Sequence, residues 1–393
     1  MCLAQLVLLA LVAVAPACAD TSGGRTGTAP PTVDDAIDVE FARGSKLPGI
    51  SCSGHWRALD ASGTETARGD GLPEGTVPAI TRDAVRLGDV ACGPPPVDIV
   101  PARSARLKIA GRGYRGTLHL DLAAGRPRVV NRVAIEDYLL GVLPGEMPER
   151  FGLEALKAQA VAARSYALAE AAAAGRVYAD TRSQAYAGRD AESPLASRAV
   201  RETRGEVLLS PAHRVVKAFY CSTCGGRTAP GRSVFDDTPA GVMELAVACP
   251  DCRSSPNYAW LRRLSASRVC DAAGLPDAPL LGVALVPATL ADRAVSVTVR
   301  AGDESATLPA TLFRERLSAG HPKDEQVLST LFSAPPRLEG GELVLEGRGW
   351  GHGVGLCQYG AAGFAARGAT YDAILARYYP GAVLGRRSAA EAP

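Results

Sequence analysis

The order of hydrophobic and polar residues predicts a group of strands followed by one long helix. Three segments, 105–109, 114–122 and 128–135, alternate between apolar and polar residues or are rich in β-branched residues, which is typical of strands. From Leu153 to about Gly175, apolar residues recur at helical spacing and charged residues fall on other faces. This spacing predicts an amphipathic helix.

The rest of the chain continues this mixed pattern. Shorter helices are predicted at 196–202, 312–317 and 371–379, and strands at 205–209, 215–220, 282–286 and 295–299. Many of the predicted strands neighbour one another in the sequence instead of alternating with helices. The predicted fold class is therefore α+β, with mixed sheets and one long helix.

Five parts of the chain differ in composition. They are an apolar leader at 1–19, a Thr, Gly and Pro-rich tether at 20–32, a small accessory module with a linker at 33–96, the main domain at 97–385, and a tail at 386–393 that we expect to be disordered.

The leader predicts export to the periplasm or cell envelope. Its apolar run, residues 3–15, is too short to cross a bilayer, which takes about 20 residues. It is typical of a signal peptide that is cleaved either after Ala19 or before Cys18. In the second case Cys18 carries a lipid, and this anchor is the only membrane contact that we expect.

Composition and charge argue against nucleic acid as a partner. With 47% hydrophobic and 21% charged residues, the 393-residue chain has the composition of a globular protein. Its formal net charge is +2, and no basic stripe is interleaved with aromatic residues. Proteins that bind nucleic acid usually carry such a stripe.

One carboxylate, Glu146, precedes the long helix and stands between Pro144 and Pro148. Each proline fixes its own φ angle and disfavours helical conformation at the residue before it, so we expect Glu146 to lie in a stiff loop outside any regular helix. The residues alone leave two interpretations open. Glu146 is either a catalytic acid or a group that caps the following helix or pairs with Arg150.

Two basic residues of the long helix, Lys157 and Arg164, are seven positions apart. This separation is two helical turns, so their side chains lie on nearly the same face. The face either lines a binding site or is simply solvated.

Eight cysteines remain once the two in the leader are set aside. Cys221-x-x-Cys224 and Cys249-x-x-Cys252 have the spacing of a structural zinc site, in which four thiolates fill all positions of the metal. The alternative is disulfide bonding, which export favours. Further pairings open to an exported chain are Cys52 with Cys92 and Cys270 with Cys357.

Seven glycines fall between residues 347 and 363, where positive φ angles or close backbone approach are expected. His352 has glycine on both sides, so it is poorly placed for a packed core and well placed to reach a ligand. Gln358 adds a polar group, and Trp350 and Tyr359 offer flat apolar faces on which sugar rings can stack.

Three stretches occur in a fixed order: YLLGVLPGEMP at 138–148 with EALKAQAVAARSY at 154–166, FYCSTCGGRT at 219–228, and GWGHGVGLCQYGA at 349–361. Together they resemble the stage II sporulation protein D family, which carries the SpoIID/LytB domain. The resemblance covers about residues 97 to 385. Members of this family include peptidoglycan lytic transglycosylases and proteins named as amidase enhancers.

The resemblance implies roles for several residues. Glu146 stands where the family has its catalytic acid, and Lys157 and Arg164 match basic residues of the same cleft. His352 and Gln358 stand where the family has its own His and Gln. The family usually has Ser where this chain has Cys357, and some relatives place metal ligands near the CxxC pairs.

A lytic transglycosylase can work with one carboxyl group, because the 6-hydroxyl of the sugar replaces the water that a hydrolase must activate. We therefore expect an enzyme that cleaves MurNAc-GlcNAc bonds of peptidoglycan to 1,6-anhydro ends; the resemblance implies a preference for strands without stem peptides, which the residues themselves leave open. The alternative is a non-catalytic peptidoglycan-binding protein that recruits or stimulates a cell-wall amidase. The expected substrate-binding residues are Lys157, Arg164, Tyr166, Gln184, Tyr220, Trp350, His352, Gln358 and Tyr359, and the expected zinc ligands are Cys221, Cys224, Cys249 and Cys252.

Overall fold

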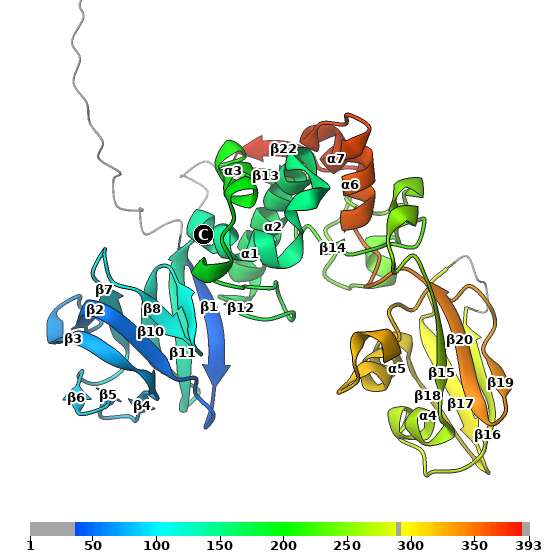
Figure 1. Cartoon of the computed structure of the whole chain (residues 1–393), viewed down its shortest axis with the longest axis horizontal. Helices are drawn as coiled ribbons and strands as arrows, with labels where there is room; N and C mark the ends of the chain where they lie inside the picture. Colours follow the sequence, from blue (N-terminus) through cyan, green and yellow to red (C-terminus); the bar gives the residue numbers. More distant parts are fainter. Residues whose placement is uncertain (1–35, 288–291, 387–393) are drawn as a thin grey trace, which may run out of the picture.

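The computed structural model describes residues 36–287 and 292–386. These residues form a curled sheet, a central group of helices and a second group of strands, from left to right in Figure 1. The expected leader and tether, and all of the expected tail except its first residue, lie outside the described residues. Among the described helices, none combines the length and the apolar character needed to cross a membrane.

A nine-stranded sheet forms the first region. Its strand order is β12-β1-β11-β10-β7-β2-β8-β9, and β3 pairs with β2. The strands are β1 (Ala36–Arg43), β2 (Ile50–Leu59), β3 (Glu65–Thr76), β7 (Val97–Pro101), β8 (Leu107–Ile109), β9 (Arg112–Tyr114), β10 (Thr117–Ala123), β11 (Arg126–Ala134) and β12 (Val177–Tyr178). The strands predicted between residues 105 and 135 are confirmed as β8, β9, β10 and β11.

The sheet runs across the domain boundary that we expected between residues 96 and 97. β1 pairs with β11, and β2 pairs with β7. The apolar side chains of β1 and β2 share one core with those of the later strands, so the first segment is part of the same sheet. Only β4 (Ala79–Ile80), β5 (Val85–Leu87) and β6 (Val90–Ala91) form a small sheet of their own.

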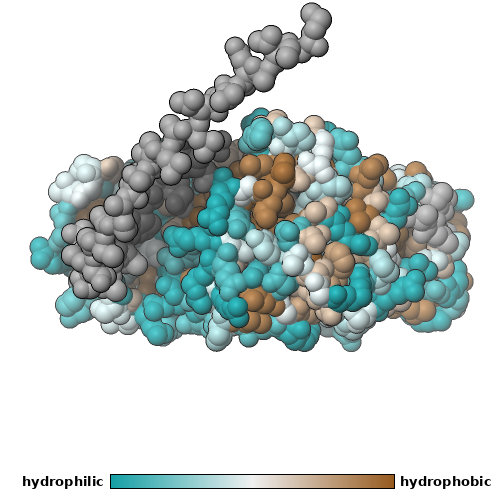
Figure 2. All heavy atoms as spheres, turned by 90° about the horizontal axis from the view of Figure 1, so that it is seen from above, coloured by the Kyte–Doolittle hydropathy of each residue, from teal (hydrophilic) through white to brown (hydrophobic). Residues whose placement is uncertain are grey.

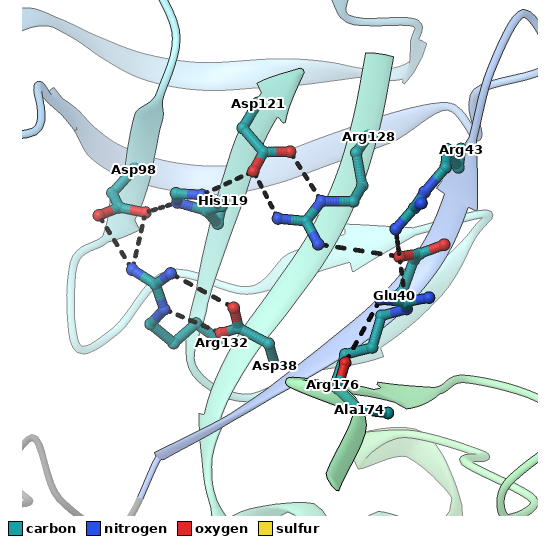
Figure 3. Close-up of polar contacts among 10 residues, drawn as sticks. All are labelled: Asp38, Glu40, Arg43, Asp98, His119, Asp121, Arg128, Arg132, Ala174 and Arg176. Atoms are coloured by element: carbon teal, nitrogen blue, oxygen red, sulfur yellow. Dashed lines mark hydrogen bonds and ion pairs between the residues drawn. The ribbon is translucent and has the colours of Figure 1, made fainter. Parts of the chain in front are cut away.

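One face of the large sheet carries a network of ion pairs (Figure 3). His119 on β10 lies between two carboxylates, with Nδ1 2.6 Å from Asp98 and Nε2 3.3 Å from Asp121. Glu40 on β1 pairs with Arg176, which follows α2, at 3.1 Å. Two further arginines join the strands, Arg128 to Asp121 and Glu40, and Arg132 to Asp38 and Asp98.

The central region is built around α2 (Leu153–Ala174), the long helix predicted from the sequence. It ends at Gly175, whose φ of 70° gives the left-handed cap that glycine favours. Its neighbours are α1 (Ile135–Glu146), α3 (Pro194–Glu202), β13 (Glu206–Leu209) and α7 (Tyr371–Tyr378). β13 pairs with β22 (Val383–Arg386), and α6 (Gln358–Ala366) precedes α7.

A two-residue strand pair joins distant parts of the chain in this region. β14 (Tyr220–Cys221) pairs in parallel with β21 (Leu356–Cys357). The strand predicted at 215–220 is largely wrong, because only its last residue lies in β14 and Val215 makes an isolated bridge to Leu209.

Residues 259–348 form a third region with a hydrophobic core of its own. Its first and last strands, β15 and β20, pair with each other, so the chain enters and leaves this region side by side. Its elements are β15 (Ala259–Leu264), α4 (Ala266–Ala273), β16 (Leu280–Val286), β17 (Ser296–Ala301), β18 (Glu304–Pro309), α5 (Ala310–Ser318), β19 (Arg337–Glu339) and β20 (Glu342–Arg348). We call it the 259–348 region.

The surface seen from above is mostly hydrophilic, with separate apolar patches between polar residues (Figure 2). Two cavities, of about 320 Å³ and 290 Å³, lie on the sheet region. Residues that line the first include His119 and Asp121, and those that line the second include Cys52 and Asp70. Neither cavity includes Glu146.

The ion-pair network predicts that the sheet loses stability in mild alkali. Burial acts to lower the pKa of His119, but hydrogen bonds to Asp121 and Asp98 outweigh it and raise the pKa to about 9. The stabilisation is therefore fully present below the unfolded pKa of about 6.5 and is lost as the pH rises through 9, by up to about 3 kcal/mol. Urea unfolding at pH 6 and pH 9.5, followed by hydrogen exchange of peptides from β10, measures this loss.

The His119→Gln variant should lose this pH dependence. The His55→Gln variant should keep it, because His55 is exposed on β2. The same pH dependence in wild type and His119→Gln would contradict the assignment.

Candidate functional site

Glu146 is the last residue of α1, which corrects our expectation that it lies outside a regular helix. Pro144 sits within α1, because the φ angle of proline is itself helical and the buried side chains of α1 hold the helix against the core. Met147 follows the helix as its C-cap and is extended, because it directly precedes Pro148 and helical conformation is disfavoured there. The second proline therefore acts as predicted and the first does not.

Two glycines of α1 allow a neighbouring segment to reach Glu146. Gly141 and Gly145 are one helical turn apart, and residues 184–188 pack directly on them. A Cβ atom on Gly145 would lie 2.7 Å from the carbonyl oxygen of Ala185, so a side chain there would push this segment away. Because the segment is close, the backbone N–H of Ala185 donates to Oε1 of Glu146 at 2.6 Å.

A chain of side-chain hydrogen bonds leads to the same carboxyl group. Tyr220 and Gln358 lie beside Glu146, and their polar side-chain groups act to lower its pKa. Gln184 holds Tyr220, since its Nε2 donates to the Tyr220 hydroxyl at 2.8 Å while its Oε1 accepts from the Tyr138 hydroxyl at 3.1 Å. The Tyr220 hydroxyl thus accepts from Gln184, which leaves its own hydrogen free to point at Glu146.

The surroundings of Glu146 favour its protonated form without closing it off from solvent. Burial raises its pKa, and the hydrogen bonds from Ala185, Tyr220 and Gln358 act in the opposite direction because they stabilise the carboxylate. The ring of Tyr166 lies 6.2 Å from that of Tyr220 and adds to the apolar surroundings. The side chain of Glu146 is half-buried, so a ligand can reach it.

His352 supports this site through Tyr220. Its Nδ1 accepts the backbone N–H of Val354 at 3.1 Å, so the ring hydrogen lies on Nε2, which donates to the carbonyl oxygen of Tyr220 at 2.8 Å. Burial, and then the charge of Arg293, lower the pKa of His352 to about 4. The imidazole is therefore neutral near pH 7 and fixes the backbone that carries Tyr220.

The structure does not bring Lys157 and Arg164 to Glu146. Arg164 is fully buried and donates two hydrogen bonds, of 2.9 and 2.8 Å, to the carboxylate of Glu136. Lys157 lies 2.6 Å from the carboxylate of Glu202 on α3. Both residues share a helix face as predicted, but the charge of Arg164 is neutralised by Glu136 of α1 and that of Lys157 by Glu202 of α3.

The two aromatic residues expected as stacking platforms take part in packing. Trp350 packs against the core of the 259–348 region, and Nζ of Lys323 lies 3.8 Å from the centre of its ring system. Tyr359 meets the ring of Phe151 edge-on, with the centroids 4.8 Å apart. Both remain partly exposed, but each already has a partner.

Sequence reasoning missed three contributors to the site. Tyr138 lies within the first motif, but only the fold reveals its bond to Gln184. Gln159 is wholly buried in α2, and its Oε1 accepts from Gln358 at 3.5 Å. A glutamine inside a run of apolar helix residues is the signal that could have found it. The backbone N–H of Ala185 could not have been predicted from the sequence, because every residue other than proline has one.

Four cysteines form a buried cluster that could hold a metal ion. The Sγ atoms of Cys224, Cys249, Cys252 and Cys357 all lie within 4.8 Å of one another. Those of Cys224 and Cys252 are 3.7 Å apart, close to the separation of about 3.8 Å between sulfurs of a tetrahedral zinc site. The donor set is thus suited to a tetrahedral metal with four sulfur ligands.

This cluster corrects one member of the predicted ligand set. Cys357 from β21 takes the place that we expected for Cys221, because pairing of β14 with β21 brings Cys357 to the knuckle. The backbone N–H of Cys224 donates to Sγ of Cys357 at 3.2 Å, and the Tyr378 hydroxyl lies 3.0 Å from Sγ of Cys249. Cys221 is buried beside the cluster but is not part of it.

All eight cysteines outside the leader are free thiols in the structure. The disulfide pairings that the sequence left open are therefore not formed: Cys357 lies in the cluster, Cys270 bonds to the carbonyl of Ala278, and Cys52 and Cys92 each bond to a nearby carbonyl.

Comparison with known proteins identifies relatives of part of the chain. Residues 123–209 match the SpoIID family, described as Stage II sporulation protein. The chain is 31% identical to an uncharacterized protein of Brachyspira hyodysenteriae, over 64% of this chain and 67% of that protein. Two Bacillus subtilis proteins are also similar: Stage II sporulation protein D, 29% identical over 64% of this chain and 74% of that protein, and the amidase enhancer, 28% identical over 72% of this chain and 45% of that protein.

The chain belongs to the SpoIID family. The SpoIID match begins in β10 and ends with β13, so it contains Glu146 and Gln184. Tyr220, Gln358 and the cysteine cluster lie outside it. The matched residues 123–209 therefore contain Glu146, whereas Tyr220 and Gln358, which act on its pKa, come from later parts of the chain.

The hydrogen bond from Tyr220 predicts a change in the titration of Glu146. Removing this donor in Tyr220→Phe destabilises the carboxylate, so the pKa of Glu146 should rise further. Carbon-13 NMR of labelled glutamate carboxyl groups measures the titration, and the Glu146→Gln variant identifies the signal.

Tyr359→Phe is the matched control. Tyr359 adjoins Gln358 and packs on Phe151, and it is not among the described hydrogen-bond partners of Glu146. Its replacement should leave the titration unchanged. An unchanged or lowered pKa in Tyr220→Phe would contradict the bond.

Proposed function

We propose that this protein is a lytic transglycosylase that cleaves the MurNAc-GlcNAc bonds of cell-wall peptidoglycan, with Glu146 as its acid and base. The observation that carries the proposal is the setting of Glu146. It is a half-buried carboxyl group whose pKa is raised by burial and which faces three hydrogen-bond donors. Membership of the SpoIID family, with relatives named for sporulation and for enhancement of an amidase, supports a role at the cell wall.

In the first step, protonated Glu146 donates its proton to the oxygen that leaves C1 of the muramic acid. The bond from C1 to this oxygen breaks, and an oxocarbenium-like centre develops at C1. Burial raises the pKa of Glu146, which favours the protonated form that this step requires. Activity should therefore fall as the pH rises above this pKa.

In the second step, the carboxylate of Glu146 takes the proton of the 6-hydroxyl group of the same sugar. The 6-oxygen then bonds to C1 and closes the 1,6-anhydro ring. The donors from Ala185, Tyr220 and Gln358 stabilise the carboxylate between the two steps. One carboxyl group is sufficient for this cycle, since no water has to be activated.

We propose zinc as the metal of the cysteine cluster, held by Cys224, Cys249, Cys252 and Cys357. Four thiolate ligands leave no open position, so zinc bound there braces the protein and takes no part in the reaction. The brace would hold together β14, β21 and the short helix Pro250–Ser254.

The protein would meet its substrate outside the cytoplasm, and we propose export through the leader, with a lipid anchor on Cys18. Residues 1–19 have the pattern of a signal peptide.

A second candidate function is that of a non-catalytic protein that binds peptidoglycan and recruits or stimulates a cell-wall amidase. The similarity to a protein named amidase enhancer favours it. In that case Glu146 would have only a structural role.

Digestion of purified glycan strands separates the two functions. Wild type should release products with 1,6-anhydro ends, detected by mass spectrometry, and Glu146→Gln should release at least about 100-fold less, since the variant cannot donate a proton. Glu149→Gln is the matched control, because Glu149 accepts the backbone N–H groups of Leu195 and Ala196, at 2.7 and 3.2 Å, and glutamine keeps an acceptor oxygen there.

Equal product from wild type and Glu146→Gln would overturn the catalytic assignment. Binding of strands by both proteins without any product would support the non-catalytic function.

The metal proposal predicts different outcomes for two neighbouring cysteines. Cys357→Ser should lower zinc content well below one per chain, because it removes a ligand, whereas Cys221→Ser should retain about one zinc per chain. Elemental analysis of protein purified from the exported fraction measures both. Peptide mapping that finds two disulfides among the four clustered cysteines would exclude a thiolate metal site.

A further inference from the structure

Arg293 connects the 259–348 region to the glycine-rich segment and to the cysteine cluster. Its guanidinium group donates to the carbonyl oxygen of Gly351 at 2.9 Å and to that of Cys224 at 3.1 Å. Gly353, with a φ of 78°, lies directly against the guanidinium, where no side chain would fit. Arg293 thus contacts the backbone on both sides of His352 and the carbonyl group of one cluster cysteine.

The positive charge of Arg293 has no carboxylate partner among residues 36–287 and 292–386. Its described hydrogen bonds go only to backbone carbonyl groups. Arg293 is half-buried. Withdrawing a charge partly from water without an opposite charge nearby is unfavourable, so such arginines are normally paired. The nearby groups that can become negative are the thiols of Cys221, Cys224 and Cys357.

The clustered thiols acquire such a charge when they bind a metal. Each cysteine ligand binds as a thiolate, and four thiolates around a divalent cation leave two negative charges in excess. The N–H of Cys224 and the hydroxyl of Tyr378 reach sulfur atoms of the cluster, but both are neutral donors. Arg293 is the cation that hydrogen-bonds to the backbone of a cluster cysteine.

We infer that Arg293 is the outer counter-charge of the four-cysteine metal centre and that it ties the loaded centre to the segment that carries His352. The inference rests on the metal proposed for the cluster, and it adds a residue from the 259–348 region to that centre. The centre would then depend on a charge supplied by a different region of the chain from its ligands.

Arg262 on β15 is an arginine of the same region with a structural role. It also donates to two carbonyl oxygens, those of Gln326 and Leu261, each at 2.7 Å. These contacts stay within the 259–348 region, and Asp324 and Arg268 are the charges that act on it. Arg262 therefore serves as a matched control for loss of a guanidinium group that is bonded to backbone.

Metal affinity tests the inference independently of catalysis. Zn²⁺ is titrated, in competition with a chelating dye, into the wild-type protein and the variants Arg293→Gln, Arg293→Lys and Arg262→Gln, all prepared without metal under reducing conditions. Arg293→Gln should bind Zn²⁺ about 10- to 100-fold more weakly, the range typical for loss of an outer-shell partner. Arg293→Lys keeps the charge and should recover most of the affinity, and Arg262→Gln should bind as wild type does.

Three results would overturn the inference. Wild-type affinity in Arg293→Gln would mean that the charge is not needed, and an equal loss in Arg293→Lys and Arg293→Gln would assign Arg293 a role in packing alone. Weaker binding in Arg262→Gln, to the same extent, would indicate a general loss of the fold. If wild type itself bound no Zn²⁺, the metal proposal would fail first, and this result is distinct from the other three.

Discussion

The approach of residues 184–188 to α1 is the contact on which the arrangement around Glu146 depends. It requires Gly141 and Gly145, because a side chain at either position would meet this segment. The approach places one N–H against the carboxyl group and positions Gln184 to hold the Tyr220 hydroxyl. Burial and hydrogen bonding then act on the pKa of Glu146 in opposite directions, and burial outweighs the hydrogen bonds.

Local patterns predicted the elements near this contact well and the long-range pairing poorly. The helix from Leu153 to Gly175 was evident, because its apolar spacing and its glycine cap are local features. Pairing of β1 with β11 joins segments about ninety residues apart, and hydrophobic alternation does not encode a partner at that distance. The interpretation of Pro144 failed for another reason: burial of α1 outweighed a local preference.

The candidate site was predicted in part, and the failures share one cause. Lys157 and Arg164 do share a helix face, but spacing alone cannot say which partners that face meets. The cysteine spacing indicated a four-sulfur site, but β21 supplies Cys357 in place of Cys221. A cysteine where the family usually has serine was a signal for this exchange, and it was visible in the sequence before the fold was known.

The pairing of β14 with β21 joins the two halves of the site. β14 begins with Tyr220 and is followed by Cys224, whereas β21 ends with Cys357 and is followed by Gln358. Tyr220 and Gln358 both act on the pKa of Glu146, and the two cysteines belong to the cluster. A metal bound by both cysteines would fix the spacing of the two strands, and therefore of the two donors. A metal in the cluster would then influence the protonation of Glu146 from a distance, because it would determine how closely those two side chains approach the carboxylate.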